Sequence, residues 1–291
     1  MRKLMFILNP QASGFKKFDF KSNIEMYLKE KATFEYDIRC TTYSQEAIKI
    51  ANDAIKDGFT ELIAVGGDGT INEVGNVAVN NDVILGIIPA GTGNDYVNSL
   101  REKTDFEYSM EKILLGKTKC IDYGSFLDKS FFNIASAGFD AEVNRNAQKI
   151  KKLVKSSLSY KISLILSLFL HKRKHYKIII DDKEYEDDFF LIAVGIGNFY
   201  GGNLNILPFA NMTDGLLDVC VIKYKSKFDI LKKVKSILNA THINQDITSY
   251  FNAKKVKIIS KDLEINYDGE YLNNLNEITF EINKNKVNLI I

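Results

Sequence analysis

Residues 62–73, Leu-Ile-Ala-Val-Gly-Gly-Asp-Gly-Thr-Ile-Asn-Glu, join an apolar run to three glycines within four residues. The run at 61–65 is typical of a buried strand, and the apolar spacing at 71–79 is typical of a helix. Glycine tolerates positive φ and lets the backbone approach a ligand closely. Successive amides at such a turn, together with the helix N-terminus, attract anions. The stretch therefore predicts a phosphate-binding turn between a strand and a helix.

Two more loops of small residues follow predicted strands. Residues 9–14, Asn-Pro-Gln-Ala-Ser-Gly, come after the apolar run at 3–8, and residues 89–95, Pro-Ala-Gly-Thr-Gly-Asn-Asp, come after the run at 83–88. In a parallel sheet all three loops emerge at the carboxyl edge of the strands, where ligands bind. Each loop alone is a weak signal, but three converging loops indicate a nucleotide site.

Asp68 lies among these phosphate-binding amides, where its carboxylate would by itself repel a phosphate. Its position makes chemical sense where Mg²⁺ bridges the carboxylate and a phosphate. The structural alternative is a tight turn in which Asp68 caps the helix and the glycines serve only the geometry. Other nucleotide signatures are missing: there is no GxxxxGK[ST], and neither glycine pair at 91–93 nor at 195–197 extends to GxGxxG.

The order of the predicted elements indicates the fold class. Strands and helices alternate over about the first 120 residues, which predicts an α/β domain with a doubly wound parallel sheet. After residue 124 strands dominate, apart from helical patterns at 141–170 and 228–238. We therefore predict a nucleotide-binding domain over residues 1–125. A β-rich, antiparallel, sandwich-like domain is predicted over 126–291, with the extreme C-terminus able to return to the first domain.

Composition excludes several classes of protein. The 291 residues are 45% hydrophobic and 26% charged, as in a globular protein with a sizeable core. The 39 basic and 37 acidic side chains give a net charge of +2, which argues against a nucleic-acid binder. Cys40, Cys120 and Cys220 lie far apart and form no CxxC pair, so reduced thiols are expected rather than disulfides or a zinc ribbon.

No stretch reaches the roughly 18 apolar residues of a membrane span, and the apolar run at 4–8 is too short for a signal peptide. The segment 149–170 has an apolar face flanked by lysines, with His-Lys-Arg-Lys at 171–174. An ordinary helix packed on the core is the favoured interpretation, and a helix lying on an anionic bilayer is the alternative. The expected location is the cytoplasm, with peripheral contact at the inner face of the membrane.

The three glycine-containing motifs, in this order, resemble the catalytic domain of the diacylglycerol kinase and sphingosine kinase family. The C-terminal half continues the resemblance, to the soluble lipid kinases of bacteria, through Phe-Asn-Ile-Ala-Ser-Ala-Gly-Phe-Asp at 132–140, Asp-Gly-Leu-Leu-Asp-Val at 214–219 and Asp-Gly-Glu at 268–270. One departure is Leu207 before Pro208, where many members have alanine. The resemblance implies ATP-dependent phosphorylation of a lipid hydroxyl, with the nucleotide on the first domain and the lipid between the two domains.

The same resemblance implies roles for individual residues. Asp68 lies nearest the phosphates, Glu270 is the candidate general base, and Asp122 completes an acidic set. By pattern alone Glu270 is equally a hairpin residue, since Asp-Gly is a common turn pair. The implied ATP contacts are Asn9, Pro10, Ser13, Gly14, Thr41, Gly66, Gly67, Asp68, Gly69, Thr70, Asn72 and Thr92.

The resemblance further implies a structural Mg²⁺ loop. Asp214 would supply a carboxylate, and the backbone carbonyls of Asn211 and Leu216 would complete an oxygen set that hard cations favour. The alternative is a plain Asp-Gly turn without a metal.

Two rival functions are weighed against the lipid kinase. An NAD kinase shares GGDGT but is not expected to carry residues 88–95 or 214–219 as they stand here. A non-catalytic nucleotide or lipid sensor would be favoured by loss of the acidic set, yet Asp68, Asp122 and Glu270 are present. The sequence does not select the lipid, and a homodimer is compatible with it.

Overall fold

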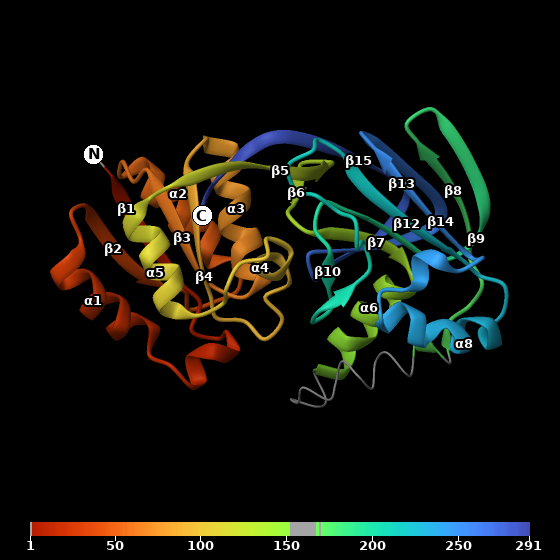
Figure 1. Cartoon of the computed structure of the whole chain (residues 1–291), viewed down its shortest axis with the longest axis horizontal. Helices are drawn as coiled ribbons and strands as arrows, with labels where there is room; N and C mark the ends of the chain where they lie inside the picture. Colours follow the sequence, from red (N-terminus) through yellow and green to blue (C-terminus); the bar gives the residue numbers. More distant parts are fainter. Residues whose placement is uncertain (1, 152–166, 169) are drawn as a thin grey trace.

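The computed structural model describes residues 2–151, 167, 168 and 170–291, and these form two parts joined by long strands (Figure 1). One continuous sheet of 13 strands runs through both parts. Along its main path the strands are ordered β13-β12-β9-β7-β14-β15-β4-β3-β1-β2. The α/β part and the β-rich part therefore share one hydrogen-bonded framework.

The first part is an α/β layer structure. Its strands β1 (Lys3–Leu8), β2 (Glu35–Cys40), β3 (Glu61–Gly66) and β4 (Ile84–Pro89) are all parallel. Its helices are η1 (Ser13–Lys16), α1 (Phe20–Lys31), α2 (Glu46–Lys56), α3 (Asp68–Asn81), α4 (Asp95–Ser99) and α5 (Phe106–Leu115). The spatial order β2-β1-β3-β4 changes direction between β1 and β3, which is the place where ligands bind in such sheets.

Alternation along the buried strands explains why helices cover both faces of this sheet. In β1, Met5 and Ile7 belong to one apolar core, whereas Phe6 and Leu8 belong to the other. Successive side chains of a strand point to opposite faces, so a strand that is apolar throughout needs a partner layer on each side. The apolar runs in the sequence therefore predicted this part correctly.

The second part is made mainly of antiparallel strands. These are β5 (Thr118–Phe126), β6 (Lys129–Phe131), β7 (Ile134–Gly138), β8 (His175–Ile180), β9 (Lys183–Gly195), β12 (Leu217–Lys223), β13 (Thr248–Ala253), β14 (Lys255–Tyr267) and β15 (Glu270–Ile290), with β10 (Phe199–Tyr200) and β11 (Leu204–Asn205) as a separate pair. The helices α6 (Phe139–Lys151), α8 (Lys227–Leu238) and η2 (His242–Asn244) accompany them. The predicted fold class, α/β followed by a β-rich sandwich-like part, is confirmed.

Strand β15 links the two parts. It begins at Glu270, pairs with β14 and β5, and near its end Leu289 pairs in parallel with Leu85 of β4. From the sequence only residues 278–282 of it are expected to form a strand, because the polar side chains at 273, 274, 276 and 277 interrupt the apolar alternation before them. The sequence also predicted two strands, 256–260 and 263–267, where β14 is one strand whose pairing with β15 shifts in register between them.

The predicted amphipathic segment 149–170 falls largely outside the described residues, so its role stays a prediction. Within the part of the chain that is described, no helix is both long and apolar enough to cross a membrane.

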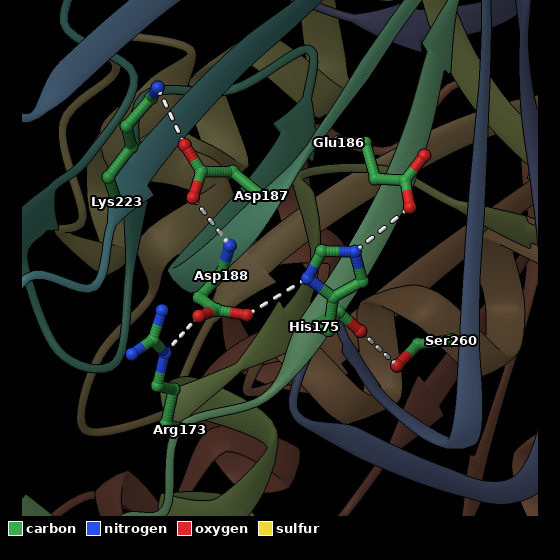
Figure 2. A network of polar contacts seen from close by, with 7 residues as sticks. All are labelled: Arg173, His175, Glu186, Asp187, Asp188, Lys223 and Ser260. Carbon is green, nitrogen blue, oxygen red and sulfur yellow. Dashed lines mark hydrogen bonds and ion pairs between the residues drawn. The ribbon is translucent and has the colours of Figure 1, made fainter.

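The acidic run at 181–188 forms the turn and the start of the second strand of the β8–β9 hairpin, and its carboxylates at 184, 186, 187 and 188 are in ion pairs. Figure 2 shows His175 hydrogen-bonded to Glu186 at 3.0 Å and to Asp188 at 2.9 Å. Asp188 also pairs with Arg173, and Asp187 with Lys223 at 2.7 Å. The run is therefore a cross-strand ion-pair network on the surface.

We predict that the stability contribution of His175 depends on pH. Its hydrogen bonds with Glu186 and Asp188 raise the pKa of the imidazole. Such a group contributes stability below its unfolded pKa of about 6.5, and the contribution is lost as the pH rises through the folded pKa. His175→Gln should therefore lower the thermal denaturation midpoint more at about pH 6 than at about pH 8.5.

The control is Lys177→Gln, which removes a salt bridge to Glu184 in the same hairpin from a group that stays charged over this range. Its effect should be equal at the two pH values. An effect of His175→Gln that does not change with pH would contradict the prediction that the protonated imidazole stabilises the fold.

Candidate active site

The three glycine-containing loops meet at one edge of the parallel sheet. The Gly14 amide donates to the Ala90 carbonyl at 2.9 Å, and the Ala90 amide donates to the Gly66 carbonyl at 2.7 Å. Side chains tie the loops as well: Asn9 Nδ2 donates to Thr70 Oγ1 at 3.0 Å, and the Ser13 and Thr92 hydroxyls lie 2.8 Å apart. The three loops therefore meet as the strand order predicts, and hydrogen bonds join them to one another.

These loops line an open, shallow cavity of about 270 Å³ that we call the loop cradle. Of the predicted ATP contacts, Asn9, Ser13, Gly67, Gly69, Thr70 and Thr92 line it. Its other lining residues are Gln11, Ala12, Glu73 and Gly91. Backbone amides, hydroxyls and the N-terminus of α3 surround this space, which is a suitable environment for phosphates.

The remaining predicted contacts lie around the cradle rather than on its lining. Pro10 is exposed in the first loop, and Gly14 is joined to Ala90. Thr41 is buried, and its amide donates to the Leu8 carbonyl at 2.8 Å. Gly66 is the last residue of β3, and Asn72 faces away toward the second part.

The glycines of the central turn differ from expectation in their backbone conformation. Gly67 has a φ of −94°, and Gly66 and Gly69 are not among the positive-φ glycines. Close approach explains Gly66 and Gly67 instead: a Cβ at Gly66 would lie 2.4 Å from Thr70 Oγ1, and one at Gly67 would lie 3.2 Å from the Gly91 backbone, whereas one at Gly69 would meet nothing within 4 Å. The turn therefore needs small residues for space, not for left-handed geometry.

Asp68 is the first residue of α3 and lies beside the cradle. Its Oδ1 accepts a hydrogen bond from the Tyr96 amide at 3.0 Å, so the carboxylate joins the second and third loops. Burial raises the pKa of Asp68, and the charge of Asp95 adds to this rise. The side chain also lines a cavity of about 210 Å³ between the two parts of the molecule.

Asp268 is the residue that sequence reasoning missed. It belongs to the quoted Asp-Gly-Glu motif, yet no role was predicted for it. Its Oδ2 accepts from the Phe132 amide at 2.7 Å and from Asn72 Nδ2 at 2.8 Å, and its Oδ1 accepts from the Asn133 and Ile134 amides at 3.0 and 3.2 Å. Burial raises its pKa to about 6, while these donors oppose the rise. Asp268 therefore joins the turn before β15 to both parts.

Glu270 follows that turn and is exposed. Together with Glu73 it lines a third cavity, of about 320 Å³, on the side of α2 and α3. Burial raises the pKa of Glu73, and the charge of Glu270 adds to the rise. Asn72 lines both this cavity and the one that Asp68 lines. The carboxylates of Asp68 and Glu270 therefore lie in adjoining cavities.

Asp122 is buried and lies against the loop at 211–216. Its Oδ2 accepts a hydrogen bond from the Gly215 amide at 2.7 Å, and its amide donates to the Met212 carbonyl at 2.8 Å. These two hydrogen bonds place Asp122 beside the predicted metal loop.

Polar atoms at that loop fit a cation. Asp214 Oδ1 accepts from the Leu216 amide at 3.0 Å, and the nearby Asp218 is buried with Oδ2 lacking a hydrogen-bond partner among the described residues. Burial raises the pKa of Asp218, and Asp214 adds to this effect. Within the described residues no group of three or more His, Cys, Asp or Glu side chains could hold a metal, so backbone carbonyls would have to contribute.

Comparison with known proteins places this geometry in a family. Residues 3–126 match the model of the diacylglycerol kinase catalytic domain, and residues 133–291 match that of the YegS C-terminal NAD kinase beta sandwich-like domain. The chain belongs to the diacylglycerol kinase family of lipid kinases. The resemblance drawn from the motifs is thus confirmed.

Curated members of the diacylglycerol kinase family match over most of their length. A protein of Bacillus subtilis named diacylglycerol kinase is 30% identical over 93% of this chain and 90% of its own. A putative lipid kinase of Streptococcus pneumoniae is 29% identical over 94% and 93%. The crystal structure of a putative diacylglycerol kinase from Bacillus anthracis shares the fold, with a TM-score of 0.79 at 24% identity, covering 99% of this chain and 97% of that one.

We predict that Gly67→Val weakens ATP binding. A branched side chain at this position would collide with the Gly91 backbone and push the second and third loops apart. Titration of ATP, followed by calorimetry, should show a loss of affinity. The exposed Gly58, which lines none of the three cavities, is the control position: Gly58→Asn should leave ATP affinity unchanged. Unaltered affinity of Gly67→Val would mean that the loop is only a turn.

Proposed function

We propose that this member of the diacylglycerol kinase family transfers the γ-phosphoryl group of ATP to the hydroxyl of a membrane lipid such as diacylglycerol. The observation that carries the proposal is the loop cradle beside an acid-lined cavity between the two parts. One cavity suits the phosphates and the other an uncharged acceptor. The names of the curated relatives support the choice of lipid.

In this proposal the loops bind the phosphates of ATP, and a bound cation neutralises part of their negative charge. The amides of the central turn and the hydroxyls of Ser13, Thr70 and Thr92 would contact phosphate oxygens. Mg²⁺, when bound, would neutralise developing charge on the transferred group. Asp68 is the residue that would hold it, because its half-buried carboxylate is bonded to the Tyr96 amide beside the loops and lines the neighbouring cavity.

The acceptor hydroxyl must give up a proton. Glu270 is our proposed base, and Asp68 is the alternative, since the two open to adjoining cavities separated by Asn72. Asp268 is held by four donors and would position the turn that carries Glu270 rather than exchange protons itself.

A second cation is proposed at the loop of residues 211–216. Asp214 and the carbonyls of Asn211 and Leu216 would hold it, and Asp218 Oδ2 would gain a partner close by. This cation would brace β12 against β5, where Asp122 lies, and would have no part in the reaction.

The lipid acceptor implies attachment to a membrane surface. We propose a cytoplasmic enzyme that visits the inner face of the membrane, where Lys172, Arg173 and Lys174 would attract anionic lipids. Arg173 pairs with Asp188, and Lys174 Nζ donates to the Asp262 carbonyl, so the exposed Lys172 would contribute most to this attraction. No observation here favours the NAD kinase or the sensor over the lipid kinase.

We predict that Asp68→Ala nearly abolishes phosphoryl transfer while the protein stays folded. Removing a group that places charge opposite the transferred phosphoryl should lower turnover by at least about 10²-fold. Asp53→Ala, on the exposed side of α2, is the matched control and should keep full activity. Near-normal turnover of purified Asp68→Ala, with an unchanged thermal midpoint, would contradict its role.

Glu270→Gln is expected to lower turnover by about 10²- to 10⁴-fold with little change in ATP affinity, because the amide cannot accept a proton at neutral pH. Glu277→Gln, an exposed residue of the same strand paired with Lys257, is the control. If Glu270→Gln changes turnover by no more than a few fold, Glu270 is a turn residue and Asp68 becomes the base.

A further inference from the structure

A further cavity, which we call the junction cavity, lies where the end of α4 meets the loop before β12. Its volume is about 490 Å³, which is within the range of small-molecule sites. Residues 99–102 of the first part and residues 209–213 of the second part line it, together with Lys119 of β5. It shares no lining residue with the loop cradle or with the cavities that Asp68 and Glu270 line.

Two basic side chains of this lining have no partner. Within the part of the chain that the structure describes, neither the guanidinium of Arg101 nor the ammonium of Lys119 forms a hydrogen bond or an ion pair. The other arginines of the chain each pair with a carboxylate; these are Arg2, Arg39, Arg145 and Arg173. Arg101 is therefore the exception among them, and its charge is available to a ligand.

No acidic side chain cancels this charge. Among the described residues only Glu102 brings a side-chain carboxylate to the lining. That carboxylate is already bound by Lys112 Nζ at 3.0 Å and by the Tyr108 hydroxyl at 2.6 Å. The junction cavity therefore presents a positive potential, which attracts an anion.

The backbone of Arg101 is unusual as well. Its φ is 59°, in the left-handed region, and the amides of Arg101 and Glu102 donate to the carbonyls of Asn98 and Val97 at 3.0 and 3.2 Å. This is the geometry that ends a helix, and glycine is the residue that adopts it without strain. An arginine at such a position is explained if its side chain serves a ligand, because strained residues concentrate at functional sites.

The rim of the cavity is apolar. Phe209 is 67% exposed, and its ring packs edge-on against Tyr250 with 5.4 Å between the ring centroids. Leu100 and Met212 line the same space. Contact with an apolar ligand group would remove the Phe209 ring from water, which is favourable. The cavity thus combines a site for an anion with a surface for an apolar group.

We propose that the junction cavity is a second phosphate site, which binds a phosphomonoester that carries an apolar group, such as a lipid phosphate. Arg101 and Lys119 hold the phosphate, since a guanidinium donates two parallel hydrogen bonds to it and an ammonium adds charge. Phe209 covers the apolar part. The product of the proposed kinase reaction belongs to this class of molecule, and only that link rests on the proposed function.

The test is calorimetric titration without ATP, using dihexanoyl phosphatidate below its critical micelle concentration and inorganic phosphate as a second ligand. Arg101→Gly and Lys119→Gln should each weaken binding of the lipid phosphate at least about tenfold, as expected for a lost hydrogen bond to a charged group. Phe209→Ser should weaken binding of the lipid phosphate and leave that of inorganic phosphate unchanged.

Leu127→Gly is the matched control for Arg101→Gly. Leu127 also has a left-handed backbone, with a φ of 49°, and it lines none of the cavities described above. Both substitutions relieve the same strain, so each should raise the thermal midpoint of the ligand-free protein by about 1–3 °C. Only Arg101→Gly should lose affinity for the lipid phosphate. A lower midpoint in Arg101→Gly would mean that Arg101 serves stability instead.

Two binding results would overturn the proposal. Unchanged affinity in Arg101→Gly would place the ligand elsewhere, and equal affinity of the wild type for inorganic phosphate and dihexanoyl phosphatidate would remove the apolar half of the site. The titration involves no turnover. A protein that phosphorylates no lipid would therefore leave this result standing, and failure of the titration would leave the proposed kinase activity untouched.

Discussion

The carboxylate of Asp268 is the interaction on which the arrangement of the site depends. It lies in the turn before β15 and accepts four hydrogen bonds, one from Asn72 of α3 and three from the backbone at Phe132–Ile134. A buried carboxylate is unfavourable unless donors surround it, and here the donors come from both parts of the molecule. The turn that carries Glu270 is thereby fixed relative to the helix that begins at Asp68.

Other polar contacts reinforce this junction. Asp95 of α4 accepts from the Gly202 and Asn203 amides at 3.0 and 2.8 Å, and Ser99 Oγ donates to Asn133 Oδ1 at 2.9 Å. Strand β15 adds a backbone connection, because it begins in the second part and ends beside β4 in the first. The cradle, the acid-lined cavity and Glu270 are held together by these contacts, which suits a reaction that depends on positioning two substrates.

The sequence predicted the elements whose pattern is local. Strands β1, β3 and β4 are apolar apart from Lys3 and Glu61 at the start of β1 and β3, and the spacing of Ile71, Val74 and Ala78 marks the buried face of α3. Convergence of the loops followed from the strand order. Strand β15 was mostly missed because its pairing with β14 and β5, and not its composition, keeps its polar residues extended. The role of Asp268 depends on donors far away in the sequence, and no local pattern reports it.

The measurement that tests the central claim most directly is incubation with γ-labelled ATP and a panel of lipids in mixed micelles, with identification of the labelled product by mass spectrometry. The account predicts label in a phosphorylated lipid that partitions into organic solvent, with a neutral glycerolipid as the preferred acceptor. Label that stays in inorganic phosphate or enters a water-soluble nucleotide such as NADP, with no lipid product, would contradict it.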